Sequence, residues 1–240
     1  MEWIDANTFF GSWPKRKLNV SAAELVKLLK EAGTSRALTL SLAAALLEAV
    51  EGNEHTREVC ARHRELIPFA AVDPRKYTGD GPVNRARELG CAAVRLTNGI
   101  NGFPLDVSPV EEIMKECAAN DLAVFLDITD WGSATVCERL AEKTGARIVM
   151  LAVRYAILSE SIISMKRSKR LYLEISKLNT PDAIRVSCDE VGPERILFGS
   201  GAPFNYAANA RAVAEHNNLT DDELEWIASK TVLSLMAENA

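Results

Sequence analysis

Eight short apolar runs, separated by longer amphipathic stretches, set the strongest constraint on the fold of this 240-residue chain. Most of these runs are continuously apolar, which indicates strands buried on both faces, as in a parallel sheet covered by helices. The amphipathic stretches between them predict those helices. The predicted strands are Trp3–Ala6, Arg36–Ser41, Ile67–Val72, Ala92–Leu96, Leu122–Ile128, Arg147–Ala152, Leu171–Ile175 and Arg195–Phe198.

Strands and helices that alternate eight times favour a single (β/α)8 TIM barrel, an α/β fold, over an open doubly wound sheet. Periodicity alone does not show closure, so the open sheet is the alternative. No Gly/Pro/Ser linker or repeat divides the chain, and we expect one domain over residues 1–240. Residues Ala43–Arg64 predict either one long helix or two helices broken near Gly52 and Asn53.

Capping residues mark two helix starts. Ser21 with Glu24 has the spacing of a capping box, in which each side chain pairs with the backbone N–H of the other residue. Thr220 with Glu223 has the same spacing and predicts a final helix that runs toward Met236.

The net charge is −5, and the sequence contains no basic stripe. This argues against a protein that binds the phosphate backbone of a nucleic acid. The five cysteines are scattered without a C-x-x-C pair, as expected for free thiols in a reducing compartment. The longest apolar stretch, Leu42–Leu47, is too short to cross a membrane, and no secretory signal is evident. We therefore expect a cytoplasmic protein without a membrane partner.

In a barrel, chemistry is expected at the carboxyl ends of the strands. The side chains predicted to line a ligand pocket there are Asn7, Arg95, Asp127, Arg154, Glu174 and Ser200. Asp127 ends a strongly apolar strand and is the candidate catalytic acid or base. The alternative is a structural ion pair with Arg95 inside the barrel. Ser200 lacks a Gly-x-Ser-x-Gly elbow, which disfavours a serine hydrolase.

In addition to the strand pattern, five segments carry motifs: Ile4-Asp5-Ala6 with Gly11, Phe69–Pro74, Leu171–Ser176, Glu194–Ser200 and the tail Leu219–Leu224. The series resembles the amidohydrolase-related (amidohydrolase 2-like) TIM-barrel family within the metal-dependent hydrolase superfamily. This branch includes metal-dependent decarboxylases and lactone hydrolases. The resemblance spans nearly the whole chain and is most specific at its two ends.

The resemblance also implies a metal site that has degenerated. The family holds its metal through a His-x-His pair after the first strand, one His after each of two later strands, and a final Asp. These positions fall on Asn7, Phe9, Asp127, Ala152 and Gly201. We expect no metal, or alternatively a weakly held Mg²⁺ or Mn²⁺ on oxygen ligands.

The histidines do not supply replacement ligands. His55, His63 and His216 all fall in predicted helices or at a helix end, away from the strand ends. Cys60 and His63 share a helix face but offer only two ligands.

Three functions are compatible with these features. The first is a catalytically silent relative that binds an unknown small molecule at the barrel mouth. The second is a hydrolase or decarboxylase that acts on a small carboxylate, lactone or amide. The third is a structural or regulatory subunit with an exposed apolar patch. A homo-oligomer is compatible with each of them.

Overall fold

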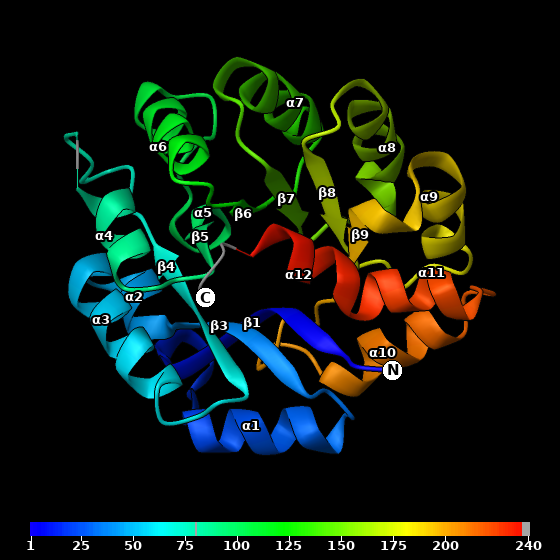
Figure 1. Ribbon diagram of the computed structural model, residues 1–240, viewed down its shortest axis with the longest axis horizontal. Coiled ribbons are helices and arrows are strands. Elements are labelled where there is room, and N and C mark those ends of the chain that lie inside the picture. Colours follow the sequence, from blue (N-terminus) through cyan, green and yellow to red (C-terminus); the bar gives the residue numbers. More distant parts are fainter. Residues whose placement is uncertain (80, 237–240) are drawn as a thin grey trace.

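The computed structural model describes residues 1–79 and 81–236, and its strands form a closed barrel surrounded by helices (Figure 1). Neighbouring strands follow the order β2-β1-β3-β4-β5-β6-β7-β8-β9, and every pairing is parallel except that of β1 with β2. The strands are β1 Ile4–Trp13, β2 Leu18–Val20, β3 Arg36–Ser41, β4 Leu66–Ala71, β5 Ala93–Leu96, β6 Val124–Asp127, β7 Ile148–Leu151, β8 Leu171–Glu174 and β9 Ile196–Leu197.

Backbone hydrogen bonds close the barrel between β1 and the segment that follows β9. The N–H of Ala6 donates to the carbonyl of Phe198 at 2.9 Å, and the N–H of Gly201 donates to the carbonyl of Asn7 at 2.9 Å. A parallel bridge joins Thr8 to Ala202. The predicted TIM barrel is therefore confirmed, and the open sheet is excluded.

The first strand is longer than predicted. It extends past Ala6 to Trp13, because residues 8–10 continue to pair with β3 and residues 11–13 pair with the antiparallel strand β2, which the sequence pattern did not reveal. Its register with β3 shifts between Asp5 and Thr8. Such an irregularity changes which side chains face inward, and here it brings both Asn7 and Phe9 to the barrel mouth.

The barrel is surrounded by a ring of helices, visible in Figure 1, and the last helix, drawn in red, lies across one end of the barrel. The helices are α1 Ala22–Glu31, α2 Leu42–Leu46, α3 Ala49–Cys60, α4 Pro82–Glu88, α5 Asn98–Asn101, α6 Ser108–Ala119, α7 Ser133–Thr144, α8 Leu158–Arg167, α9 Ala183–Val191, α10 Ala207–Glu215, α11 Asp221–Glu225 and α12 Thr231–Leu235. A π-helical turn, Trp226–Lys230, joins α11 to α12. Within the described part of the chain, no helix has both the length and the apolar character that crossing a membrane requires.

The predicted break at Gly52–Asn53 is wrong. The chain breaks at Leu47 and Glu48, between α2 and α3, and Gly52 lies inside α3. A Cβ atom at Gly52 would overlap the backbone of Ala44, so the glycine is required for the close packing of α3 on α2.

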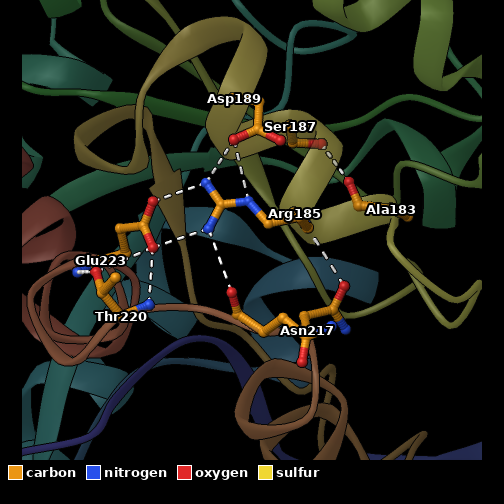
Figure 2. Close-up of polar contacts among 8 residues, drawn as sticks. Ala183, Arg185, Ser187, Asp189, Asn217, Thr220 and Glu223 are labelled. Carbon is orange, nitrogen blue, oxygen red and sulfur yellow. Dashed lines mark hydrogen bonds and ion pairs between the residues drawn. The ribbon is translucent and has the colours of Figure 1, made fainter.

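Both predicted capping boxes are confirmed, and the second also fixes a helix pair. Glu223 pairs with Thr220 at the start of α11 and receives hydrogen bonds from Arg185 of α9 at 2.7 and 2.8 Å (Figure 2). The Arg185 guanidinium and the Thr220 N–H together lower the pKa of Glu223 to about 2. Arg185 also donates to Asp189 of α9, so one arginine joins α9 to α11.

Side chains alternate between two apolar layers along the strands. On β7, Val149 and Leu151 belong to the cluster inside the barrel, whereas Ile148 and Met150 face the helices. Phe69 and Phe125 are fully buried in the inner cluster, with ring centroids 4.8 Å apart. This alternation determines which polar side chain at each strand end enters the barrel.

The end of the barrel at which the strands begin is covered by α12. Val232 and Leu235 of this helix pack in the inner cluster. Arg147, directly before β7, donates to the carbonyl of Ser234 at 3.3 Å. Since the strands begin at this end, the barrel opens only toward their carboxyl ends.

Candidate functional site

Polar side chains converge inside the barrel at the carboxyl ends of the strands. Arg95 follows Ala93 on the inward face of β5, Asp127 follows Phe125 on β6, and Glu174 follows Tyr172 on β8. A cavity of about 190 Å³ lies at this end. Its walls include Asn7, Phe9, Arg95, Asp127, Lys177 and Phe204.

Arg95 is the central cation of the cavity. Its side chain is only 3% exposed, and its Nη1 donates to Asn7 Oδ1 at 2.7 Å. The guanidinium carbon lies 4.1 Å from the ring centroid of Phe9, a cation–π contact. Burial lowers the pKa of Arg95, while the charges of Asp127, Glu174 and Asp5 oppose this effect.

Part of the Arg95 guanidinium has no hydrogen-bond acceptor among the described residues. Arg95 Nε is buried and has no hydrogen-bond partner among the described residues, and Nη2 lies 3.9 Å from Asp127 Oδ1. Buried donors without partners are costly, and an arginine offers five N–H groups in a planar fork. A bound anion in the cavity would supply an acceptor for Nη2.

Two buried carboxyl groups lie behind Arg95. Glu174 receives hydrogen bonds from the Ser176 hydroxyl at 2.8 Å and from Asn7 Nδ2 at 3.2 Å. Asp5 Oδ1 receives the backbone N–H groups of Asn7 and Ser200 at 3.0 and 2.9 Å. Burial raises the pKa of Glu174 to about 7 and that of Asp5 to about 6, despite these donors.

The raised pKa of Glu174 predicts a pH-dependent stability. The folded protein binds this proton more tightly than the unfolded chain does, so the free energy of unfolding should fall as pH rises from about 4.5 to about 7. Glu174→Gln should remove up to about 3 kcal/mol of that decline. Urea unfolding between pH 4.5 and 8 measures it, with the exposed Glu58→Gln as control. An unchanged pH slope in Glu174→Gln would contradict the burial of a titrating Glu174.

Asp127 also lines the cavity, with its carboxylate beside the guanidinium of Arg95. Its backbone N–H and carbonyl pair with the side chain of Asn98 at 3.0 and 2.7 Å, which fixes the strand end. Gly99 leaves room for the carboxylate, because a Cβ atom there would come within 2.7 Å of Asp127 Oδ2. The side chain is 15% exposed, so solvent or a ligand can reach it.

The remaining wall comes from the loops after β8 and β9. Lys177 Nζ donates to Asn205 Oδ1 at 2.7 Å, and Asn205 Nδ2 donates to the carbonyl of Ser200 at 3.0 Å. Phe204 packs edge-on against Phe9, with centroids 5.7 Å apart. A second cation and an aromatic pair thus line the same small space as Arg95.

The structure brings together most of the side chains predicted to form the pocket. Asn7, Arg95 and Asp127 line the cavity, and Glu174 contacts Asn7 directly behind it. Arg154 is exposed and is not among the residues that line the cavity.

Ser200 is buried and is not among the residues that line this cavity; its side chain bonds to the backbone. Its hydroxyl accepts the Ala202 N–H at 3.0 Å.

The sequence did not single out Lys177, Phe204 and Asn205, which line the cavity. Lys177 and Asn205 both lie a few residues past a predicted strand, which is the signal that could have identified them. Their convergence depends on how two loops fold over the barrel, and no periodic pattern encodes that.

At four of the family's five ligand positions no side-chain atom is available to a metal ion, whereas Asp127 at the fifth has a carboxylate. Asn7 Oδ1 accepts from Arg95, and Phe9 and Ala152 offer no donor atom. At Gly201 the backbone φ of +71° disfavours a side chain, and a Cβ atom would overlap the Asn205 amide. In residues 1–79 and 81–236, no three His, Cys, Asp or Glu side chains are grouped so as to hold a metal ion.

The histidines lie away from the cavity, as the sequence predicted. His55 is in α3, His63 follows that helix, and His216 ends α10. All five cysteines are buried and free. Burial raises the pKa of Cys60, for example, to about 12.

No protein-family model and no curated protein matches this sequence. Solved structures do match its fold along nearly the whole chain. A dihydroxybenzoic acid decarboxylase from Polaromonas sp. JS666, with bound manganese and the inhibitor 2-nitroresorcinol, is 15% identical with a TM-score of 0.74, covering 98% of this chain and 96% of its own.

Two further structures show the same likeness. A probable 2-pyrone-4,6-dicarboxylic acid hydrolase from Acinetobacter baumannii, with citric acid bound, is 14% identical with a TM-score of 0.71 and coverage of 98% and 99%. A putative amidohydrolase from Staphylococcus aureus is 12% identical with a TM-score of 0.72 and the same coverage. The resemblance to amidohydrolase-related TIM barrels is thus confirmed at the level of the fold.

Proposed function

We propose that this protein is an enzyme of the decarboxylase and hydrolase type that acts on a small carboxylate without a metal ion such as the manganese bound in the structurally similar dihydroxybenzoic acid decarboxylase. The observation that carries this proposal is the Arg95 guanidinium, which lines the cavity and whose Nη2 lies 3.9 Å from Asp127 Oδ1, beyond hydrogen-bond distance. A carboxylate is the anion that matches an arginine fork with two parallel hydrogen bonds.

The shape and charge of the cavity support a small, planar ligand. Its volume of about 190 Å³ lies below the roughly 300–1,000 Å³ of sites for drug-sized molecules. The rings of Phe9 and Phe204 offer apolar surface to the body of the ligand, while Lys177 adds positive charge. Aromatic or heterocyclic carboxylates combine these properties.

Asp127 is the side chain placed to move a proton. Its carboxylate lies 3.9 Å from Arg95 Nη2, at the open side of the cavity. A ligand carboxylate held by Arg95 would therefore place its neighbouring atoms beside Asp127, within reach of proton transfer. Glu174 and Asp5 are fully enclosed and act instead as a polar support for Asn7 and Arg95.

Compounds from the structural relatives provide the first test of this proposal. Metal-stripped protein should bind one or more of 2,6-dihydroxybenzoate, 2-nitroresorcinol, 2-pyrone-4,6-dicarboxylate and citrate in calorimetry, and should convert a bound carboxylate to product. Asp127→Asn should lower turnover by roughly 10²–10⁴-fold while leaving the dissociation constant within a few-fold. Asp121→Asn, at the opposite end of the barrel and paired with Arg147, is the matched control.

A binding protein without catalysis is the second candidate, favoured by the replacement of the family's ligand residues. Tight binding with no product from any compound would support it and exclude the enzyme. Turnover that appears only when Mn²⁺ is added would contradict the metal-free site.

A further inference from the structure

A second, larger cavity adjoins the first. Its volume is about 620 Å³, and it lies between the α5 region and the loop that leads from β6 into α7. Gly99, Asp127 and Thr129 line both cavities, so they form the shared wall. Nothing in the proposed carboxylate chemistry accounts for this second space.

The shared wall is thin. Gly99 contributes only backbone, and the Asp127 side chain packs directly against it: a Cβ atom at Gly99 would lie 2.7 Å from Asp127 Oδ2 and 2.8 Å from its Cγ. The carboxylate therefore marks the junction between the small cavity and the larger one, here termed the outer groove.

Trp131 presents its indole on a fixed turn at the outer groove. The residue is 68% exposed, and the turn after it is held from α8, because the N–H groups of Gly132 and Thr135 donate to the Glu160 carboxylate at 2.9 and 2.8 Å. A large apolar ring that is exposed on an anchored turn offers its face to a binding partner.

The polar groups of the outer groove are acceptors and hydroxyls. The carboxylates of Asp106 and Asp130 and the hydroxyls of Thr129 and Ser133 line it, with Arg139 as its one cation among the described lining residues. A ring that carries several hydroxyl groups fits this set, since its O–H groups donate to carboxylates while its C–H face covers an indole. Another carboxylate would be repelled by the acidic side chains.

We propose that the outer groove binds a hydroxylated, sugar-like ring that is linked to the carboxylate-bearing part of the ligand, with the linking bond beside Asp127. This inference rests on the proposed carboxylate site, because the first half of the ligand must be anchored at Arg95. The substrate class would be glycosides or comparable polyol conjugates of small aromatic carboxylates.

Paired ligands test the outer groove separately from the inner site. Calorimetry compares 3- and 4-hydroxybenzoate with their O-β-glucosides. At least one glucoside should bind wild-type protein about 10-fold or more tightly than its parent acid. In Trp131→Ala this gain should shrink to within about 3-fold, while the affinity for the parent acid stays unchanged. Tyr206→Ala, an 81% exposed aromatic residue outside the outer groove, should retain the full gain.

The contrary outcomes are distinguishable. If the parent acids bind but neither glucoside gains, the outer groove does not hold a sugar-like ring, while the proposed function stands. If an aminoethyl ether of hydroxybenzoate gains instead, the groove selects a cation, and the assignment to hydroxyl groups is wrong. If no compound binds, the proposed carboxylate site fails first and the outer groove with it.

Discussion

Replacing Arg95 with methionine is expected to weaken the binding of a small carboxylate by roughly 100-fold or more. Two charge-assisted hydrogen bonds to a carboxylate are each worth about 1.5–3 kcal/mol, and methionine supplies neither. The substitution keeps an apolar side chain against Phe9, which Arg95 covers at 4.1 Å. Calorimetry with the best carboxylate from the panel measures the change in dissociation constant.

Two controls separate a loss of binding from a loss of folding. Arg154→Met changes an exposed arginine outside the cavity and should leave affinity unaltered. Removing Arg95 also removes the positive charge that interacts with Glu174 and Asp5, so the comparison is best made at or below pH 6, where the raised pKa of Glu174 favours its protonated form. If folded Arg95→Met binds as tightly as the wild type, the carboxylate site is not at Arg95.

Truncation of Phe125 should destabilise the fold by about 3–5 kcal/mol, the range for a large aromatic residue in a well-packed core. Phe125 on β6 is fully buried inside the barrel and packs edge-on against Phe69 of β4. It also lies one inward position below Asp127, so the cavity left by Phe125→Ala would loosen the floor of the site. Urea denaturation monitored by circular dichroism gives the change in unfolding free energy.

The matched comparison for Phe125 is Tyr206→Ala, which truncates an aromatic side chain that is 81% exposed. Its effect should stay within about 0.5 kcal/mol, as for most surface positions. A loss of less than 1 kcal/mol in Phe125→Ala would indicate that the barrel interior is not packed as described here.

The strands were predictable because burial on both faces leaves a continuous apolar run in the sequence. The run Arg36–Ser41 matches β3 at both ends, and the other predicted strands overlap their observed counterparts. Most of the inward-facing polar residues were predictable too. Arg95, Asp127 and Glu174 interrupt apolar strands at positions that alternate with inward-facing neighbours, and such interruptions are rare without a reason.

Other features depend on contacts between distant segments. The segment that forms the hairpin of β1 with β2 is short and has no distinctive sequence pattern. The break between α2 and α3 accompanies the close approach of Gly52 to Ala44. Arg154 follows a strand, as the pocket residues do, yet the chain turns it outward. Proximity to a strand end is therefore not sufficient to place a residue in the cavity.

By itself, the sequence determined the barrel and the replacement of the family's ligand residues by Asn7, Phe9, Asp127, Ala152 and Gly201, because burial and donor chemistry are properties of residue types. Only the tertiary structure decided that Arg95, Lys177 and Asp127 share one cavity, with a second cavity beyond Asp127. These side chains come from different strands and loops, and their distances arise from barrel closure, which no local pattern encodes.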